Sequence, residues 1–215
     1  QSDPGRWPTN WNRSFEFKAK QPGPGVLLIH GMSDSPYSLK TLGLSLKKSG
    51  VWVVGLRLPG NGTVPSGLVH IRWQDMAAAV KLAMQHLRSK IGNQPIYIVG
   101  YSTGGALAMH YVLTTLDDSK LTKAKGVIMI SPSIGVSGVA VLAKWQARLG
   151  YLLGLNKLKW NSINPEFDPY KYGSFAVNAG DQVYRLTSEI QSLFNQYDKE
   201  KLKQIPPILA FQSVV

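Results

Sequence analysis

The chain has 215 residues, no cysteine, and 24 basic against 12 acidic side chains, which gives a formal charge of +12 at pH 7. With 44% hydrophobic and 17% charged residues it has the composition of a globular protein with a sizeable core, and a disordered, collagen-like or coiled-coil chain is excluded. The lack of cysteine excludes a disulfide scaffold, a zinc–thiolate site, an iron–sulfur centre and cysteine catalysis.

Short apolar segments rich in β-branched or aromatic residues predict the strands of a sheet that is buried on both faces. These segments are residues 26–29, 51–54, 96–99, 127–130 and 207–211. Residues 15–18 alternate between aromatic and charged side chains instead, which predicts an outer antiparallel strand.

Longer helical patterns lie between these segments. Residues 38–49 carry four leucines and stop at Gly50, and residues 104–116 follow their strand after a very short turn. Residues 73–90 stop at Gly92, with one apolar face formed by Met76, Val80, Ala83, Met84 and Leu87. This alternation predicts an α/β fold: a doubly wound, mostly parallel sheet with helices on both faces.

Residues 131–181 interrupt the alternation, because they are rich in aromatic residues and contain no clear buried strand. Helical pieces around 139–149 carry an apolar face. We therefore expect a mobile, mostly helical cap insertion at 135–181, whose aromatic face lines a pocket. The predicted organisation is a first part of the core at 1–134, the cap, and a resumed core at 182–215 that is truncated in a sheet strand.

The apolar runs are of strand length, far short of the roughly 20 residues that a membrane span needs. The first residue is Gln1 and no apolar signal core is present, so the sequence leaves open a cytoplasmic location and a cell-envelope or periplasmic one after leader removal. The basic residues are scattered in short clusters, whereas a nucleic-acid binder concentrates them, and we expect no nucleic-acid partner. A solvated basic surface and peripheral contact with an anionic membrane both remain open.

The strongest functional pattern is Gly100-Tyr101-Ser102-Thr103-Gly104-Gly105, a G-x-S-x-G motif between a predicted strand and a predicted helix. This strand–turn–helix context holds a serine in a strained conformation, and the glycines leave room for the turn. The helix N-terminus also presents free N–H groups to developing negative charge. The pattern indicates that Ser102 is a nucleophile.

A second pattern, His30-Gly31-Met32, follows the first buried strand, at the edge of a parallel sheet where sites assemble. Acyl transfer needs two N–H donors aimed at the oxyanion. We expect the backbone N–H groups of Met32 and Thr103 to supply them. For His30 we expect a role in ordering the loop rather than in catalysis.

Together with Leu58-Pro59-Gly60-Asn61-Gly62 and Trp73-Gln74-Asp75, these motifs resemble the α/β-hydrolase superfamily, and within it the bacterial carboxylesterase and monoacylglycerol-lipase-like serine hydrolases. The resemblance covers nearly the whole chain. It implies a Ser–His–Asp triad, an oxyanion hole, a lid over an acyl pocket and no cofactor; we also expect no metal. One departure is Asn61, where the family often has histidine between the two glycines; since this is no triad position, it affects the expected loop geometry rather than the chemistry.

The triad cannot be completed within these residues. In this fold the chain order is serine, acid, histidine, yet the last histidine is His110, about 12 Å down the predicted helix from Ser102. Asp168 and Asp181 precede the last predicted strand and are expected in the cap or at its exit. The acid and the histidine are therefore unknown and expected beyond Val215, in a longer polypeptide or in a second chain that completes the fold.

The preferred function is hydrolysis of carboxylic esters, either short- to medium-chain acyl esters or monoacylglycerol-like lipids, through an acyl-enzyme on Ser102. The alternatives are a catalytically silent binding protein with this fold, a peptidase, and a cofactor-free haloperoxidase. The sequence determines neither the acyl length nor the alcohol.

Overall fold

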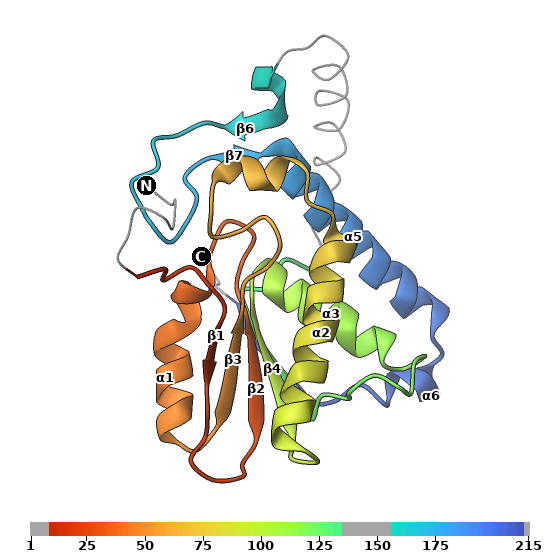
Figure 1. The fold of residues 1–215 in the computed structure, drawn as a ribbon. Helices are drawn as coiled ribbons and strands as arrows, with labels where there is room; N and C mark the ends of the chain where they lie inside the picture. The colour runs from red at the N-terminus through yellow and green to blue at the C-terminus, as the bar shows by residue number, and fades with distance from the viewer. Residues whose placement is uncertain (1–8, 135–155, 213–215) are drawn as a thin grey trace.

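The apolar segments form one six-stranded sheet in the computed structural model, which describes residues 9–134 and 156–212 (Figure 1). Its strands are β1 (Phe15–Phe17), β2 (Gly25–Ile29), β3 (Trp52–Leu56), β4 (Ile96–Tyr101), β5 (Gly126–Ile130) and β8 (Ile208–Phe211). The strand order is β1-β3-β2-β4-β5-β8, and every pair is parallel except β1 with β3. The predicted strands, including the outer antiparallel one, are confirmed.

Helices cover both faces of the sheet. After a short 3-10 turn, η2 (Pro36–Leu39), helix α1 (Lys40–Lys48) packs on the β1 and β3 side. A second 3-10 turn, η3 (Pro65–Val69), leads to α2 (Trp73–Ile91), which lies with α3 (Thr103–Thr114) and α5 (Val177–Gln196) over the other face. The short α6 (Lys199–Leu202) precedes β8. No described helix is long and apolar enough to cross a membrane.

The larger hydrophobic core lies under α2, α3 and α5. The five residues predicted for the apolar face of α2 are its buried residues, and Gly92 ends that helix with a positive φ of 60°. In α1, by contrast, Leu42 and Leu44 are exposed and Gly43 is the buried residue. The helix approaches the sheet closely at Gly43, where a Cβ atom would press on Phe15 and Leu28. Of the four leucines, Leu39 is buried and Leu46 packs against the smaller core cluster, while the two in between are exposed.

The predicted helical pieces at 139–149 lie outside the described residues. The described end of the predicted cap is not mostly helical: it holds a 3-10 turn, η4 (Asn156–Lys159), and a two-stranded antiparallel sheet of β6 (Trp160–Ser162) and β7 (Phe175–Ala176). Between these strands, the Glu166 carboxylate accepts hydrogen bonds from the N–H groups of Gly173 and Ser174, at 2.7 and 2.8 Å. Such side chain-to-backbone bonds, together with Pro165 and Pro169, favour a loop over a helix.

Among the described residues, β8 is the last strand of the sheet, and its apolar side chains are exposed. Ile208, Leu209 and Phe211 are 40%, 52% and 55% exposed. The strand pairs with β5 in register, from Val127 opposite Ile208 to Ile130 opposite Phe211. The last predicted strand therefore forms, as an edge strand with exposed apolar side chains.

Candidate active site

Ser102 lies at the sharp turn between β4 and α3. Its φ of 52° and ψ of −117° place it in a region that residues other than glycine rarely adopt, and such strain is typical of functional sites. Hydrogen bonds on both sides hold the turn: the Ser102 N–H donates to the Ile130 carbonyl at 2.9 Å, and the Ser102 carbonyl accepts from the Gly105 N–H at 2.9 Å. The predicted strand–turn–helix geometry is confirmed.

The glycines on either side of Ser102 are required because the backbone segments touch. A Cβ atom on Gly100 would lie 2.3 Å from the Gly104 carbonyl oxygen. A Cβ atom on Gly104 would lie 2.1 Å from the Ile29 carbonyl oxygen, at the end of β2. The first turn of α3 can approach β2 and β4 this closely only where no side chain intervenes.

A cavity of about 380 Å³ lies at the carboxyl ends of the strands, and Ser102 is one of the residues that line it. Met32 and Thr103, the two residues predicted to provide the oxyanion N–H groups, line the same cavity. Thr103 is the first residue of α3, so its N–H has no acceptor within the helix. The structure thus brings the three predicted site residues together; the remaining lining residues are Ser33, Asp34, Tyr101, Ser133, Lys171, Phe175, Gly180 and Val183.

The hydroxyl of Ser102 has a partner that the sequence did not suggest. The Oγ atoms of Ser102 and Ser133 are 3.0 Å apart, and the Ser133 N–H donates to the Ser102 carbonyl at 3.1 Å. Ser133 follows β5, the strand next to β4. The available signal was its position just after a predicted parallel strand, since those carboxyl ends meet at one edge of the sheet.

His30 is fully buried and orders the loop after β2. Its Nδ1 lies 2.7 Å from the Gly31 carbonyl oxygen, and its Nε2 accepts the Leu58 N–H at 3.1 Å. Both ring nitrogens are thus engaged by backbone groups in the neutral tautomer that carries its proton on Nδ1. Burial lowers the pKa of His30 to about 4, with the Gly31 bond opposing that shift. These contacts agree with the predicted structural role.

Asn61 holds the same loop from the opposite side. This buried side chain donates from Nδ2 to the Met32 carbonyl and, at 3.2 Å, to the Asp34 carbonyl. Asn61, which stands where the family often has histidine, thus fixes the backbone that carries the Met32 N–H. The motif alone did not indicate this role, because the two segments are 29 residues apart.

None of the four histidines lines the described cavity. The ring of His110 packs edge-on against Trp73, at a centroid distance of 5.0 Å, and burial lowers its pKa to about 4. His86 lies on α2 with its Nε2 3.2 Å from the Glu16 carboxylate, and neither residue lines the cavity. The Asp168 carboxylate accepts the Tyr170 N–H, and the Asp181 carboxylate, in α5, accepts a hydrogen bond from Arg185. The described residues also contain no group of three potential metal ligands.

Two aromatic residues of the described cap region lie at or near the site. Phe175 lines the cavity. Tyr172 is buried; its hydroxyl accepts the Thr63 N–H at 2.9 Å and donates to the Gly60 carbonyl at 3.1 Å, which ties the segment to the Gly-Asn-Gly loop. Phe167, by contrast, is 78% exposed. Only part of the predicted aromatic surface therefore faces the pocket.

Two charged residues also line the cavity. Asp34 is 7% exposed, and burial raises the pKa of its carboxyl; Lys171 opposes this shift and Asp168 adds to it. The cavity therefore combines an apolar wall, formed by Phe175 and Val183, with a polar side near Met32.

A parallel sheet with a serine at a strained strand–helix turn and helices on both faces defines an α/β hydrolase. The chain belongs to the Hydrolase_4 family, described as serine aminopeptidase, S33, whose model matches residues 20–205.

Two curated relatives are lipolytic by name. The chain is 32% identical over 94 residues to the thermostable monoacylglycerol lipase of Bacillus sp. (strain H-257), which covers 44% of this chain and 37% of that protein. It is 30% identical over 123 residues to phospholipase YtpA of Bacillus subtilis (strain 168), which covers 57% of this chain and 45% of that protein. The matched segments thus span less than half the length of either relative.

Solved structures share the fold. A structure described for LipS and LipT, two metagenome-derived lipolytic enzymes, matches with a TM-score of 0.68 at 20% identity, over 94% of this chain and 76% of that one. The monoacylglycerol lipase of Paleococcus ferrophilus matches with a TM-score of 0.62 at 16% identity, over 93% and 88% of the two chains.

Proposed function

We propose that the protein hydrolyses carboxylic esters, of short to medium acyl chains or of monoacylglycerol-like lipids, with Ser102 as the nucleophile. The observation that carries the proposal is the position of Ser102: a strained residue at the N-terminus of α3, in one cavity with Met32 and Thr103. The lipolytic names of the two relatives support an ester rather than another acyl substrate.

In the proposed reaction, the Ser102 Oγ attacks the ester carbonyl carbon and the carbonyl oxygen takes up the negative charge. The N–H groups of Met32 and Thr103 stabilise this oxyanion, and His30 and Asn61 hold the loop that carries the first of them. When the intermediate collapses, the bond to the alcohol breaks and an acyl-Ser102 ester remains, which water then cleaves.

The proton of Ser102 passes to a histidine, which returns it to the leaving alcohol. Because no histidine lines the described cavity, we propose that this histidine and its acid come from residues beyond those given, in the same polypeptide or in a second chain. In the structure the Ser133 hydroxyl is the partner of the nucleophile. On binding of substrate, the Ser102 Oγ exchanges this partner for the base.

A fluorophosphonate probe tests the proposal, because it reacts covalently with activated serines. In the complete natural protein we expect labelling of Ser102 and none in Ser102→Ala. The matched control is Ser133→Ala, which removes a hydroxyl 3.0 Å away and should keep its label. Labelling at another residue, or equal labelling of the Ser102→Ala variant, contradicts the assignment of the nucleophile.

A catalytically silent binding protein is the second candidate, favoured by the absence of a histidine from the lining of the described cavity. A folded complete protein that takes no label would support it. The family description also names an aminopeptidase, so p-nitrophenyl acetate should be compared with an aminoacyl p-nitroanilide. Turnover of the anilide but not of the ester would indicate a peptidase that uses the same serine.

A further inference from the structure

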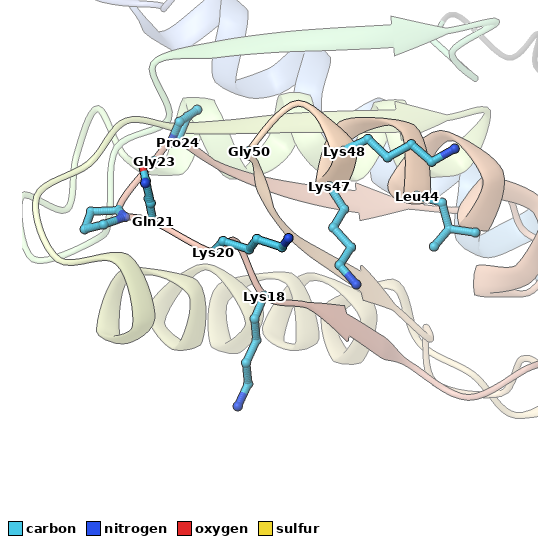
Figure 2. A pocket seen from close by; sticks show the side chains of 10 residues that line it. Lys18, Lys20, Gln21, Gly23, Pro24, Leu44, Lys47, Lys48 and Gly50 are labelled. Carbon is cyan, nitrogen blue, oxygen red and sulfur yellow. The ribbon is translucent and has the colours of Figure 1, made fainter.

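A second pocket lies at the opposite end of the sheet from Ser102 (Figure 2). It has a volume of about 800 Å³ and lies between two connections, the one that joins β1 to β2 and the one that joins α1 to β3. We refer to it as the lysine pocket. Its lining residues are Lys18, Lys20, Gln21, Pro22, Gly23, Pro24, Leu44, Lys47, Lys48 and Gly50.

The lining is cationic and has no acidic residue. Lys18 and Lys20 come from the segment after β1, while Lys47 and Lys48 come from the last turn of α1 (Figure 2). In the described part of the chain, none of these four lysines forms a salt bridge or a side-chain hydrogen bond. Several acidic residues are instead paired elsewhere, as Asp117 is with Lys201 and Asp181 with Arg185. Lys47 lies over the Phe17 ring, with its Nζ atom 5.7 Å from the ring centroid. No described acidic side chain, however, forms a salt bridge with any of the four lysines, so the positive charge of the pocket is not neutralised by a carboxylate.

The backbone beneath these lysines is fixed. A Cβ atom on Gly23 would lie 2.6 Å from the Gly50 carbonyl oxygen, so the two connections are in direct contact. The Trp52 N–H donates to the Pro24 carbonyl at 2.9 Å, and the Gly50 N–H donates to the Lys47 carbonyl at 3.0 Å. Pro22 and Pro24 restrict the turn further. The attachment points of the four lysines are thus held in place, and only their side chains need to adjust to a ligand.

We propose that the lysine pocket binds phosphate groups that carry two or more negative charges. Ammonium groups are compact point charges and common phosphate ligands, whereas planar carboxylates are matched better by arginine, which the lining does not contain. Several neighbouring cations repel one another, and a multiply charged anion relieves that repulsion better than a singly charged one. The site is separate from the proposed hydrolytic one, since the two pockets share no residue.

Such phosphate can come from a soluble compound or from the headgroups of an anionic membrane, and the probes separate these sources. Inorganic pyrophosphate represents the first, with acetate as the singly charged comparison. Phosphatidylcholine vesicles that contain phosphatidic acid, a phosphomonoester whose phosphate carries up to two negative charges, represent the second, with pure phosphatidylcholine vesicles as the comparison. Binding to the full chain is followed by calorimetry for the small anions and by co-sedimentation for the vesicles.

The test variant is Lys20→Gln/Lys47→Gln, with one lysine removed from each wall of the pocket. The matched control is Lys120→Gln/Lys123→Gln, which removes the same net charge from two exposed lysines in the connection between α3 and β5. We expect at least tenfold weaker binding in the test variant, because each exposed charge pair contributes a factor of about five to the binding constant and the variant removes two lysines. Binding should also weaken from 0.01 to 0.15 M salt, as the Debye length falls from about 30 to about 8 Å.

Pyrophosphate binding that exceeds acetate binding and is lost in the test variant alone supports the proposal with a soluble ligand. Binding only to the vesicles that contain phosphatidic acid, lost in the same variant, supports it with a membrane headgroup. Equal weakening in both double variants overturns it, because the attraction then comes from the net charge of the chain. Failure of pyrophosphate and of the vesicles to bind overturns it as well.

Discussion

The two ends of the parallel sheet differ in how their polar groups are held. At the carboxyl ends, around Ser102, polar side chains are buried, and they are bonded to backbone: His30 to Gly31 and Leu58, and Asn61 to the Met32 loop. At the amino ends, around the lysine pocket, the polar groups are exposed ammonium groups on a fixed backbone. The six residues of β4 alone span about 20 Å along this direction.

The two environments suit two different kinds of chemistry. Attack on a carbonyl needs donors fixed in advance and shielded from water, which buried and hydrogen-bonded groups provide. Attraction of an anion needs only charge density, which solvated and adjustable side chains provide. Substitutions at the two ends of the sheet can therefore confirm or break this contrast.

Ser102→Ala should give the largest effect. In the complete natural protein we expect hydrolysis of p-nitrophenyl acetate to fall by about 10⁴-fold or more, as for loss of a triad nucleophile. Thermal unfolding should stay close to that of the unaltered protein, since alanine keeps the Cβ atom of serine, so the strain at φ 52° is unchanged and only one hydroxyl is lost. Retained turnover in the purified variant would show that the carboxyl-end cavity is not the hydrolytic site.

Gly104→Ala should destabilise the fold by at least about 3 kcal/mol, because its Cβ would lie 2.1 Å from the Ile29 carbonyl oxygen and the backbone must move. Urea unfolding followed by circular dichroism measures this. The control is Gly180→Ala in α5, where the nearest atom would be Phe175 Cε1 at 3.8 Å. That change should stabilise by up to about 1 kcal/mol through helix propensity. Equal effects at both glycines would contradict the tight fit of the turn.

The buried histidines should make the protein lose stability in mild acid. His110 has a pKa of about 4 in the folded state, against 6.5 for an unperturbed histidine. Between these values the unfolded chain binds more protons, so the free energy of unfolding falls as the pH drops from 6.5 to 4. His110→Phe keeps a ring against Trp73 and should remove up to about 3 kcal/mol of that loss. Parallel stability–pH curves for the two proteins would contradict the assigned burial.

Tyr172→Phe removes the hydroxyl that joins the cap region to Gly60 and Thr63. We expect a loss of about 1–2 kcal/mol in the free energy of unfolding, because the Thr63 N–H loses its acceptor. Tyr97→Phe on β4 is the control, since within the described residues its hydroxyl forms no hydrogen bond, and its effect should stay within about 0.5 kcal/mol. A similar change in both variants would mean that the Tyr172 hydroxyl does not hold the segment.

Lys20→Gln/Lys47→Gln should have the smallest effect on stability. Both side chains are exposed and neither forms a salt bridge in the described part of the chain, so we expect a change within about 0.5 kcal/mol in the free energy of unfolding. A larger loss would show that these lysines support the fold, and the contrast between the two ends would fail.

Local patterns were sufficient to predict the strands, the buried face of α2 and the turn at Ser102. Each depends on residues close in sequence: apolar runs for β2 and β4, a 3.6-residue period for α2, and flanking glycines for the turn. No local pattern indicated that Gly43 is the buried residue of α1, because the side chains that cover it, Phe15 and Leu28, belong to β1 and β2. The prediction of a mostly helical cap was wrong at its described end, where Glu166 binds backbone N–H groups across a loop.

The sequence by itself determined the fold class and the candidate nucleophile, since both follow from the order of short segments along the chain. Only the tertiary structure showed what surrounds them. The contact of Ser133 with Ser102 joins residues 31 positions apart, and that of Asn61 with Met32 joins residues 29 apart. The contact of Tyr172 with Thr63 spans 109 positions. The four lysines likewise read as scattered pairs in the sequence, and only the contact between Gly23 and Gly50 gathers them around one pocket. Contacts of this kind depend on how the strands and helices pack, and no local pattern of residues encodes that packing.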